Sequence, residues 1–461
     1  MYIMRSLIAI LAAKAALKVN RLTGTGGSSL PGMIAKRLDK DILRKLVINN
    51  FPKGIIVITG TNGKTTTASM VANVLEESGI SFIHNRSGSN MERGLISTIV
   101  ESSGLDGKIL ADVGLFEVDE AYMPKVCRAI RPDWVIVTNL FRDQLDRYGE
   151  LDKIARNFRN LFEELPDTKL VLNADDPLVA SLGYKHDGRS KAEYFGIGDY
   201  IGPKLSHDRT ADSIFDPFTQ EKLHYTQKYF GHIGRYRGKP GEFTRPKPEY
   251  SANSVKQIGI DSVEFVVNKS TDYVKLSIPG LFNVYNAIAA FALSKVAFNL
   301  EDRELVRAIS GSLAAFGRSE KLSYEGRDIL MLLIKNPTGL NQVIQTYLLN
   351  ESDRLLVFVI NDNYADGRDV SWLWDAAIED LATYKGKIMV SGSRARDMAL
   401  RLKYAGLEDI MVVDDSSKLL EQIKLNSSKR SKVFILPTYT AMLAIRSSIV
   451  SEDEKAKEFW Q

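Results

Sequence analysis

The sequence predicts two domains of the α/β class: a central domain built on a parallel sheet with a phosphate-binding P-loop, and a C-terminal, doubly wound, Rossmann-like domain. Three observations predict this class. Short apolar, β-branched runs alternate with helix-length segments, GTNGKTT stands between the first run and a helix, and a second alternating series begins after Arg318. Such alternation is typical of doubly wound parallel sheets. At 461 residues the chain is also too long for one core.

The charge balance does not indicate binding to a large polyanion. The chain has 61 Lys and Arg against 57 Asp and Glu, a net charge of +4, and 44% hydrophobic residues, which is typical of globular proteins. We therefore expect no nucleic-acid partner. The single cysteine, Cys127, excludes an intramolecular disulfide and a cysteine-based zinc or iron–sulfur site, and it fits a reducing, cytoplasmic setting.

Residues 1–45 are expected to form an N-terminal helix and a loop. Met1–Val19 has a charge followed by an apolar run, but Lys14 and Lys18 interrupt it, and its uninterrupted part is far shorter than the roughly 20 residues that span a bilayer. Two interpretations stay open: a helix docked on the protein body, which we favour, and an interfacial helix at the inner face of the membrane. TGTGGSSLPG (23–32) cannot continue the helix.

Residues 46–317 are expected to form the central domain. Its strands are predicted from five apolar runs: GIIVITG (54–60), ISFIHN (80–85), ILADVGLFEVD (109–119), DWVIVTN (133–139) and KLVLNAD (169–175). A ribbon-like insertion is expected at about 205–250, where Gly, Pro, Tyr and His accumulate. The strand pattern then resumes with VEFVVN and VKLSIPG, and Asn283–Phe298 is predicted to be a helix.

Residues 318–461 are expected to form the C-terminal α/β domain, with FGRSE near the join. Five further runs, each followed by a helical stretch, predict its strands: ILMLLI (329–334), LLVFVI (355–360), KIMVSG (387–392), IMVVD (410–414) and VFILPT (433–438).

The strongest local signal for chemistry is ITGTNGKTTT. Gly60 and Gly63 let backbone amides close around phosphate oxygens, and Lys64 supplies a positive charge to the terminal phosphates. Thr65 or Thr66 can place a hydroxyl on magnesium. The loop departs from the standard Walker spacing in its first glycine. The alternative is a glycine-rich turn with an exposed lysine, but the strand before it and the helix after it favour nucleotide binding.

Acidic and amide residues follow neighbouring strands where each strand ends. Glu117 and Asp119 follow one strand, and Asn139 and RDQLDRYGE (142–150) follow the next. Because the carboxyl ends of parallel strands lie at one edge of the sheet, these residues can provide metal ligands beside a phosphate. Each residue alone could equally be a helix cap or a loop residue.

These motifs occur in the order seen in the Mur ligase superfamily of ATP-dependent enzymes that form amide bonds. The chain resembles that superfamily through GTNGKTT, FEVDE, TNLFRDQLDRYGE, LNADDP, GLFNVYNAIAA and FGRSE. Such enzymes phosphorylate a carboxylate and let an amine attack the acyl phosphate. Within the superfamily the chain is most similar to the MurT family, the synthase subunits of lipid II isoglutaminyl synthase, through SLPG, DQLDRYGE, KNPTGLN, NDNYADGRDVSWLWD, SGSRARDMALRLKYAG and LPTYTAML.

The resemblance implies a site for ATP and Mg²⁺. Magnesium is assigned to Thr65 and Glu117, Asn283 lies toward the nucleotide, and Lys64 and Arg318 act on the transferring phosphate as catalytic residues. Lysine, arginine and magnesium supply the charge neutralisation that phosphoryl transfer needs. The ATP-binding residues carried over are Gly60, Thr61, Asn62, Gly63, Lys64, Thr65, Thr66, Asn283 and Arg318.

The chain also departs from the superfamily. Most members that add amino acids have a histidine where Gln144 stands and a modified lysine soon after, and neither is evident here, which favours ammonia as the nucleophile. LNADDP (172–177) resembles a loop on the nucleotide side and could equally be a plain turn.

Many MurT-like chains carry four cysteines in two C-x-x-C knuckles of the insertion. The corresponding places here hold Asp216, Thr219, Gly238 and Gly241. A tetrahedral thiolate site cannot form without thiolates, so we expect no zinc site. The insertion's two histidines, His224 and His232, are interpreted as solvated or packed. We expect the insertion to be looser, or to be held by aromatic packing of Tyr225, Tyr229, Phe230 and Tyr236.

The ammonia is expected to come from another chain. Cys127 has neither an adjacent histidine base nor a sharp glycine turn, so it is interpreted as a buried small hydrophobe. The resemblance implies a partner, a GatD-like class I glutaminase subunit, whose site a carboxylate of the C-terminal domain completes. Of the candidates Asp362, Asp366, Asp369 and Asp375, we select Asp369 as catalytic. The alternative is that these aspartates cap the following helix.

The resemblance implies that the α-carboxylate of D-glutamate in the lipid II stem peptide is amidated to D-isoglutamine during peptidoglycan synthesis. Two alternatives stay open. One is a Mur-type or folylpolyglutamate-type amino-acid ligase, in which an amino acid rather than ammonia stimulates phosphate release. The other is a nucleotide-binding scaffold for a glutaminase, although GKT, Glu117 and Arg318 argue for a working ATP site.

Overall fold

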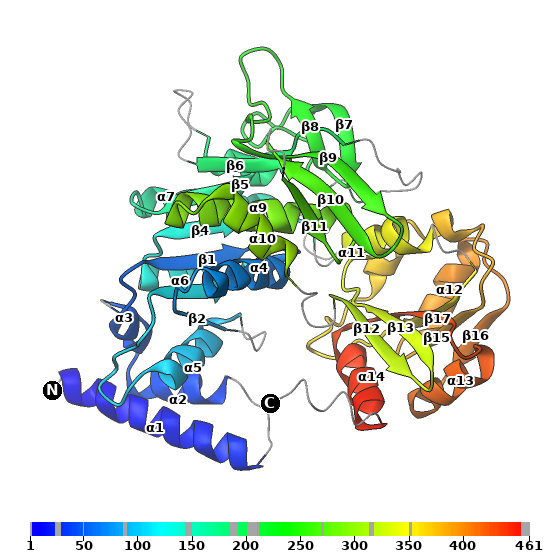
Figure 1. Ribbon diagram of the computed structural model, residues 1–461, viewed down its shortest axis with the longest axis horizontal. Coiled ribbons are helices and arrows are strands. Elements are labelled where there is room, and N and C mark those ends of the chain that lie inside the picture. Colours follow the sequence, from blue (N-terminus) through cyan, green and yellow to red (C-terminus); the bar gives the residue numbers. More distant parts are fainter. Residues whose placement is uncertain are drawn as a thin grey trace.

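Two sheets, each with helices on both faces, organise the chain (Figure 1). The structure is a computed structural model. It describes the residue ranges 2–23, 29–48, 50–85, 90–142, 150–184, 192–200, 210, 212–268, 272–312, 318–349 and 353–452.

The first sheet has nine strands, and its central strands are buried on both faces. All five residues of IIVIT in β1 are buried, which suits a β-branched run inside a parallel sheet. In the order of pairing the strands are β11 (Tyr273–Leu276), β10 (Ser262–Val267), β9 (Tyr250–Ile258), β6 (Ala192–Ile197), β5 (Lys169–Asn173), β4 (Trp134–Val137), β1 (Ile55–Thr59), β3 (Val113–Glu117) and β2 (Phe82–His84).

Alternate residues of β1 enter two separate apolar clusters, because successive side chains of a strand point to opposite faces. Val57 packs with the helices of one face and Ile58 with those of the other. The first face carries α1 (Tyr2–Thr23), α2 (Leu30–Leu38), α3 (Ile42–Val47), α5 (Glu92–Ser102), α6 (Met123–Ile130), α7 (Glu150–Glu164) and α8 (Pro177–Ser181). The second face carries α4 (Lys64–Glu77), α9 (Leu281–Phe298) and α10 (Asp302–Ser310).

The second sheet has six strands. In the order of pairing they are β12 (Arg318–Tyr324), β13 (Arg327–Leu332), β17 (Lys432–Pro437), β14 (Leu355–Val359), β15 (Ile388–Ser391) and β16 (Ile410–Val413). Its helices are α11 (Pro337–Val343), which continues as a π-helical turn over Ile344–Leu348, α12 (Ala395–Tyr404), α13 (Leu419–Asn426) and α14 (Tyr439–Glu452). Short 3-10 turns cover Ser371–Trp374, Ile378–Leu381 and Ser416–Lys418.

The α/β class and the strands expected from apolar runs are confirmed, but each sheet is mixed rather than wholly parallel. β9, β10 and β11 pair antiparallel at one edge, and β12 pairs antiparallel with β13. Two strands of the first sheet, β6 and β9, were not predicted. In β9 half-buried and exposed residues largely alternate and only Ala252 is buried, and its sequence, YSANSVKQI, has no continuous apolar run.

The insertion contains a two-stranded antiparallel hairpin, β7 (His224–Phe230) and β8 (Ile233–Arg237). The expected aromatic packing is present, since the rings of Tyr225 and Tyr236 lie 5.8 Å apart and Tyr236 also contacts Phe243.

Helix α9 is the one helix among the described residues that is long and apolar enough to cross a membrane. Most of α9 is buried against the first sheet, so it is a core helix of this domain.

Candidate functional site

The glycine-rich loop after β1 has the conformation that its glycines permit. Gly60 and Gly63 have φ values of 130° and 87°, which side-chain-bearing residues rarely adopt. A Cβ on Gly60 would lie 2.2 Å from Oγ1 of Thr138, and one on Gly63 would lie 2.1 Å from Oδ1 of Asn286. Both glycines are therefore required by conformation and by space.

The loop that follows β4 holds the glycine-rich loop in place. Oδ1 of Asn139 accepts the Asn62 backbone N–H at 2.9 Å, and Nδ2 of Asn139 donates to the Asn62 carbonyl at 2.9 Å. The Thr61 hydroxyl is bonded to the Phe141 backbone on both sides, as donor at 3.1 Å and acceptor at 3.0 Å. The sequence placed Asn139 beside a metal, whereas here its amide positions the loop.

Lys64 begins α4 and is buried together with an acidic partner. Its Nζ donates to the Gly60 carbonyl and lies 2.9 Å from Oε2 of Glu120. Burial, the largest influence, acts to raise the pKa of Glu120, but the ammonium groups of Lys64 and Lys335 outweigh it and lower that pKa to about 2. The neighbouring Asp119 has a raised pKa, chiefly because of burial and then because of the Glu120 charge.

A cavity of about 120 Å³ lies beside this loop, between the two sheets. The first sheet and its helices contribute an asparagine set and several aromatic rings: Asn62, Asn139, Asn173, Asn286, Phe141, Phe230, Phe282 and Tyr285. The second sheet and α11 contribute Lys335, Thr338, Gly339, Gln342 and Tyr347, among others. Apolar rings with a few converging amides and a cation are typical of a small-molecule pocket.

Direct contacts join the two sides of the cavity. Nδ2 of Asn336 donates to Oδ1 of Asn62 at 3.2 Å, and a guanidinium nitrogen of Arg142 lies 3.8 Å from Asp375.

The insertion supports one wall of the cavity through a buried ionic network. Asp175 is fully buried, its Oδ1 pairs with Arg245 of the insertion, and its Oδ2 accepts the Tyr285 hydroxyl at 2.7 Å. Tyr285 lines the cavity, so Arg245 acts on the cavity wall through Asp175. His232, between the hairpin strands, is fully buried, with its ring 4.5 Å from that of Phe141.

Several predicted ATP-binding residues adjoin the cavity, and others do not. Asn62, Gly63 and Thr66 line it. Asn283 is buried and does not line the cavity. Its side chain donates to the Pro279 carbonyl and accepts from the side chain of Asn286. Of this asparagine pair, Asn286 is the residue that lines the cavity.

Glu117 and Thr65, the residues predicted to hold magnesium, do not line the cavity. Glu117 is buried at the end of β3, where its backbone is bonded to the Asn85 side chain. Thr65 is partly exposed in the first turn of α4. Arg318 begins β12, but its side chain and Gln144 lie outside the described residues.

Hydrogen bonds are present at three of the four insertion positions considered above: Asp216, Thr219 and Gly238. Asp216 is buried, and its Oδ1 accepts the backbone N–H groups of Phe218 at 2.8 Å and Thr219 at 3.1 Å. Gly238 donates its backbone N–H to the Phe243 carbonyl at 2.9 Å. Within the described parts of the chain, no three His, Cys, Asp or Glu side chains gather as a metal site.

The four aspartates of the loop after β14 all have structural partners. Asp362 accepts from the Ser393 hydroxyl, and Asp366 accepts from Thr440 at the start of α14. Asp369, the selected candidate, accepts the Ser371 backbone N–H at 2.8 Å and the Ser371 hydroxyl, and Val370 stands at the N-cap of the turn over Ser371–Trp374.

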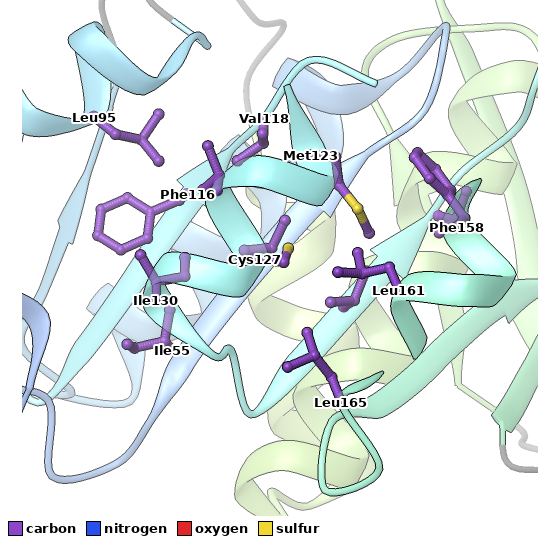
Figure 2. Close-up of a cluster of buried hydrophobic side chains, with 14 of the residues drawn as sticks. Ile55, Leu95, Phe116, Val118, Met123, Cys127, Ile130, Phe158, Leu161 and Leu165 are labelled. Carbon is purple, nitrogen blue, oxygen red and sulfur yellow. The ribbon is translucent and has the colours of Figure 1, made fainter. Parts of the chain in front are cut away.

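Cys127 is buried among apolar side chains. Figure 2 shows Cys127 within a cluster that includes Met123, Ile130, Leu161 and Phe116. Burial raises the pKa of the thiol well above its usual range. The interpretation as a small core residue is confirmed, and the thiol is unsuited to act as a nucleophile.

Sequence reasoning missed several polar residues of the site, among them Glu120, Lys335 and Asn336. Each stood inside a motif that carried the resemblance, FEVDE or KNPTGLN, but nothing in a motif shows which of its side chains meets a residue distant in sequence.

Two family models match the chain, one described as "Mur ligase middle domain" over residues 58–232 and one as "MurT ligase C-terminal" over residues 333–442. A curated relative from Streptococcus pneumoniae (strain ATCC BAA-255 / R6), named lipid II isoglutaminyl synthase (glutamine-hydrolyzing) subunit MurT, is 34% identical over 94% of each chain. The protein of the same name from Staphylococcus aureus (strain COL) is 34% identical over 89% of this chain and 90% of its own.

Solved structures share the fold at lower identity. A pseudomurein peptide ligase type C from Methanothermus fervidus superposes with a TM-score of 0.69 at 21% identity, covering 90% of this chain and 81% of that one. A MurF ligase from Thermotoga maritima, solved in complex with ADP, superposes with a TM-score of 0.61 at 14% identity, covering 91% and 84%.

Proposed function

The chain belongs to the MurT family of Mur-ligase-like proteins, and we propose that it amidates the α-carboxylate of D-glutamate in the lipid II stem peptide. The γ-phosphoryl group of ATP is transferred to the carboxylate, ADP leaves, and ammonia attacks the acyl phosphate and expels phosphate to give D-isoglutamine. The observation that carries this proposal is the family match over nearly the whole chain, together with a glycine loop and lysine beside a cavity between the two sheets.

The residues present fit ATP. The glycine loop leaves no room for a Cβ, and it ends at the N-terminus of α4, where backbone N–H groups favour phosphate. Lys64 is held among oxygen atoms by the Gly60 carbonyl and Glu120, so its ammonium is already oriented beside the loop. Asn62 and Thr66 are proposed to contact the nucleotide, with Gly60, Thr61, Gly63, Thr65 and Asn283 as the other members of the carried-over set.

Mg²⁺ is proposed to be held by Thr65 and Glu117. A hydroxyl and a carboxylate are hard oxygen ligands, and a magnesium ion at a phosphate site needs only one or two protein ligands besides phosphate and water. When bound, the ion neutralises phosphate charge. Arg318 is proposed, from the family resemblance, to reach the transferring phosphate, where it would add a second positive charge to that of Lys64.

A GatD-like class I glutaminase is proposed as the partner that supplies ammonia, with Asp369 completing its site. Large exposed rings lie on the same part of the C-terminal domain, since Tyr364 is in the loop that precedes Asp369 and Trp374 follows it. The rings of Trp374 and Tyr404 lie 5.5 Å apart, and aromatic pairs of this kind are typical of protein interfaces. We further propose that the protein acts in the cytoplasm, in peripheral contact with the inner face of the membrane.

The test is mass spectrometry of lipid II incubated with the purified chain, ATP, magnesium and an ammonium salt, because free ammonium replaces the glutaminase. We expect ATP-dependent conversion of a carboxylate to a carboxamide. Lys64→Ala should abolish it, whereas Lys53→Ala, at the other end of β1 and half exposed, should leave it unchanged.

Two other outcomes would identify the alternatives. Phosphate release stimulated by an amino acid instead of ammonium would indicate an amino-acid ligase. Absence of conversion with ammonium and also with a co-expressed glutaminase, while Lys64→Ala still binds that glutaminase, would indicate a scaffold.

A further inference from the structure

Helix α1 is apolar on both faces. Its inner face packs Ala9, Ile10 and Ala13 into the apolar cluster of the protein body. Residues 7, 11, 15 and 19 follow at intervals of four, which places them on one stripe of a helix, and all four are exposed. We call Leu7, Ile8, Leu11, Ala15 and Val19 the outer face of α1. Large aliphatic side chains there, such as Ile8 at 52% exposed, are not needed to hold the helix on the body.

The charged residues of α1 itself all have one sign. The first 38 residues contain six Lys or Arg and no Asp or Glu, although the whole chain has a net charge of only +4. Arg5 and Lys18 of α1 are exposed beside the outer face, and the stem of Lys14 reaches inward, where its Nζ donates to the Ser103 carbonyl. An apolar stripe on a helix whose charged residues are all cations is complementary to an anionic lipid surface.

The helix is fastened to the body along its inner side. The Ser6 hydroxyl donates to Asp39 at 2.7 Å, and Nε of Arg5 donates to the Leu38 carbonyl at 2.8 Å. From Arg5 to Lys14 the helix is therefore held on the body and presents a fixed surface rather than a segment that can insert across a bilayer. Figure 1 shows α1 along one edge of the molecule, with α2 and α5 between it and the first sheet, and far from the C-terminal domain.

We propose that the outer face of α1 docks on a bilayer that contains anionic lipids, with the helix lying in the plane of the headgroups. At about 1.5 Å per residue its 22 residues extend over roughly 33 Å, enough for the apolar stripe to contact the interface along its length. The purpose of the docking rests on the proposed function, because lipid II is anchored in the membrane, but the surface is argued from its own residues.

The experiment is co-sedimentation of the full chain with vesicles of phosphatidylglycerol and phosphatidylcholine, compared with vesicles of phosphatidylcholine alone. We expect binding to the anionic vesicles that weakens as salt rises, because the Debye length shrinks. Ile8→Gln/Leu11→Gln should bind about tenfold more weakly, since it removes apolar area from the interface. The matched control is Leu425→Gln, on α13 of the C-terminal domain, where a leucine is also exposed and binding should be unchanged.

Ile8 and Leu11 are exposed, so the double variant should unfold at the same temperature as the wild type. An unchanged transition would exclude misfolding as the cause of weaker vesicle binding. The proposal is overturned if the wild-type chain does not bind anionic vesicles at low salt, or if the double variant binds as well as the wild type. It is also overturned if a co-expressed glutaminase occupies this face and abolishes vesicle binding.

Amidation of lipid II in detergent with free ammonium separates this proposal from the proposed function. Vesicle binding without amidation in detergent would remove the proposed function and leave the docking surface. Amidation in detergent without vesicle binding would remove the docking surface and leave the proposed function.

Discussion

Nδ2 of Asn336 donates a hydrogen bond to Oδ1 of Asn62 at 3.2 Å, and so connects the second α/β unit to the glycine loop of the first. Oδ1 of Asn336 also accepts the Gly339 backbone N–H at 2.8 Å and caps α11. Because α11 contributes to the cavity wall, the side chain of Asn336 bonds both to that wall and to the loop proposed to bind phosphate.

Replacing Asn336 by aspartate should weaken ATP binding while leaving the helix cap intact. The aspartate keeps an oxygen for the Gly339 N–H but has no N–H to give to Asn62. A hydrogen bond of this kind is worth about 0.5–1.5 kcal/mol, so the dissociation constant for ATP should rise roughly 2- to 10-fold. Isothermal titration calorimetry measures the constant, and denaturant unfolding checks the cap. Unchanged affinity would show that the contact does not support the nucleotide site.

Glu120 should stabilise the fold in a pH-dependent way. Its pKa is about 2 in the folded state against an ordinary value of 4.5, so its contribution is present above about pH 4.5 and is lost as the pH falls toward 2. The full difference corresponds to about 3 kcal/mol. Glu120→Gln should therefore lower the free energy of unfolding at pH 7 and lower it progressively less below pH 4.5.

The control for this measurement is Glu408→Gln, at an exposed position of the C-terminal domain, which should leave the pH dependence unchanged. A difference between Glu120→Gln and wild type that stays constant from pH 7 to pH 3 would contradict the low pKa. Urea unfolding curves at each pH give the free energies.

Arg245→Met should destabilise the protein by about 3–5 kcal/mol, because it leaves the fully buried carboxylate of Asp175 without its cation. Arg237→Met, on the same ribbon but exposed, should cost little. Chemical denaturation compares the two variants. Equal, small effects would mean that water or another group compensates the Asp175 charge.

Cys127 should not react with a thiol reagent in the native protein, because the thiol is buried and its pKa is raised. In denaturant it should react fully, with one equivalent per chain, since the sequence has a single cysteine. The absorbance of the thionitrobenzoate released from Ellman's reagent follows both reactions. Rapid labelling without denaturant would contradict the buried position seen in Figure 2.

Local patterns of the sequence were sufficient for much of the fold. β1 is a continuous β-branched run. Gly60 and Gly63 predict the loop after it, because few other residues tolerate a positive φ. β6 and β9 were missed; β6 pairs with β5 and β9, which are separate segments, and β9 has no continuous apolar run of its own. Pairing between segments distant in sequence leaves no local signal.

The same division holds for the site and for the surface of α1. The residue types, order and spacing in the sequence by themselves determined the glycine loop, its lysine, the family resemblance and the all-basic N-terminal segment. Only the tertiary structure decided that Lys64 pairs with Glu120, that Asn336 meets Asn62, and that the aliphatic stripe of α1 faces outward. The physical reason is that a chain's local preferences set each element, whereas contacts between elements depend on how their buried faces pack together.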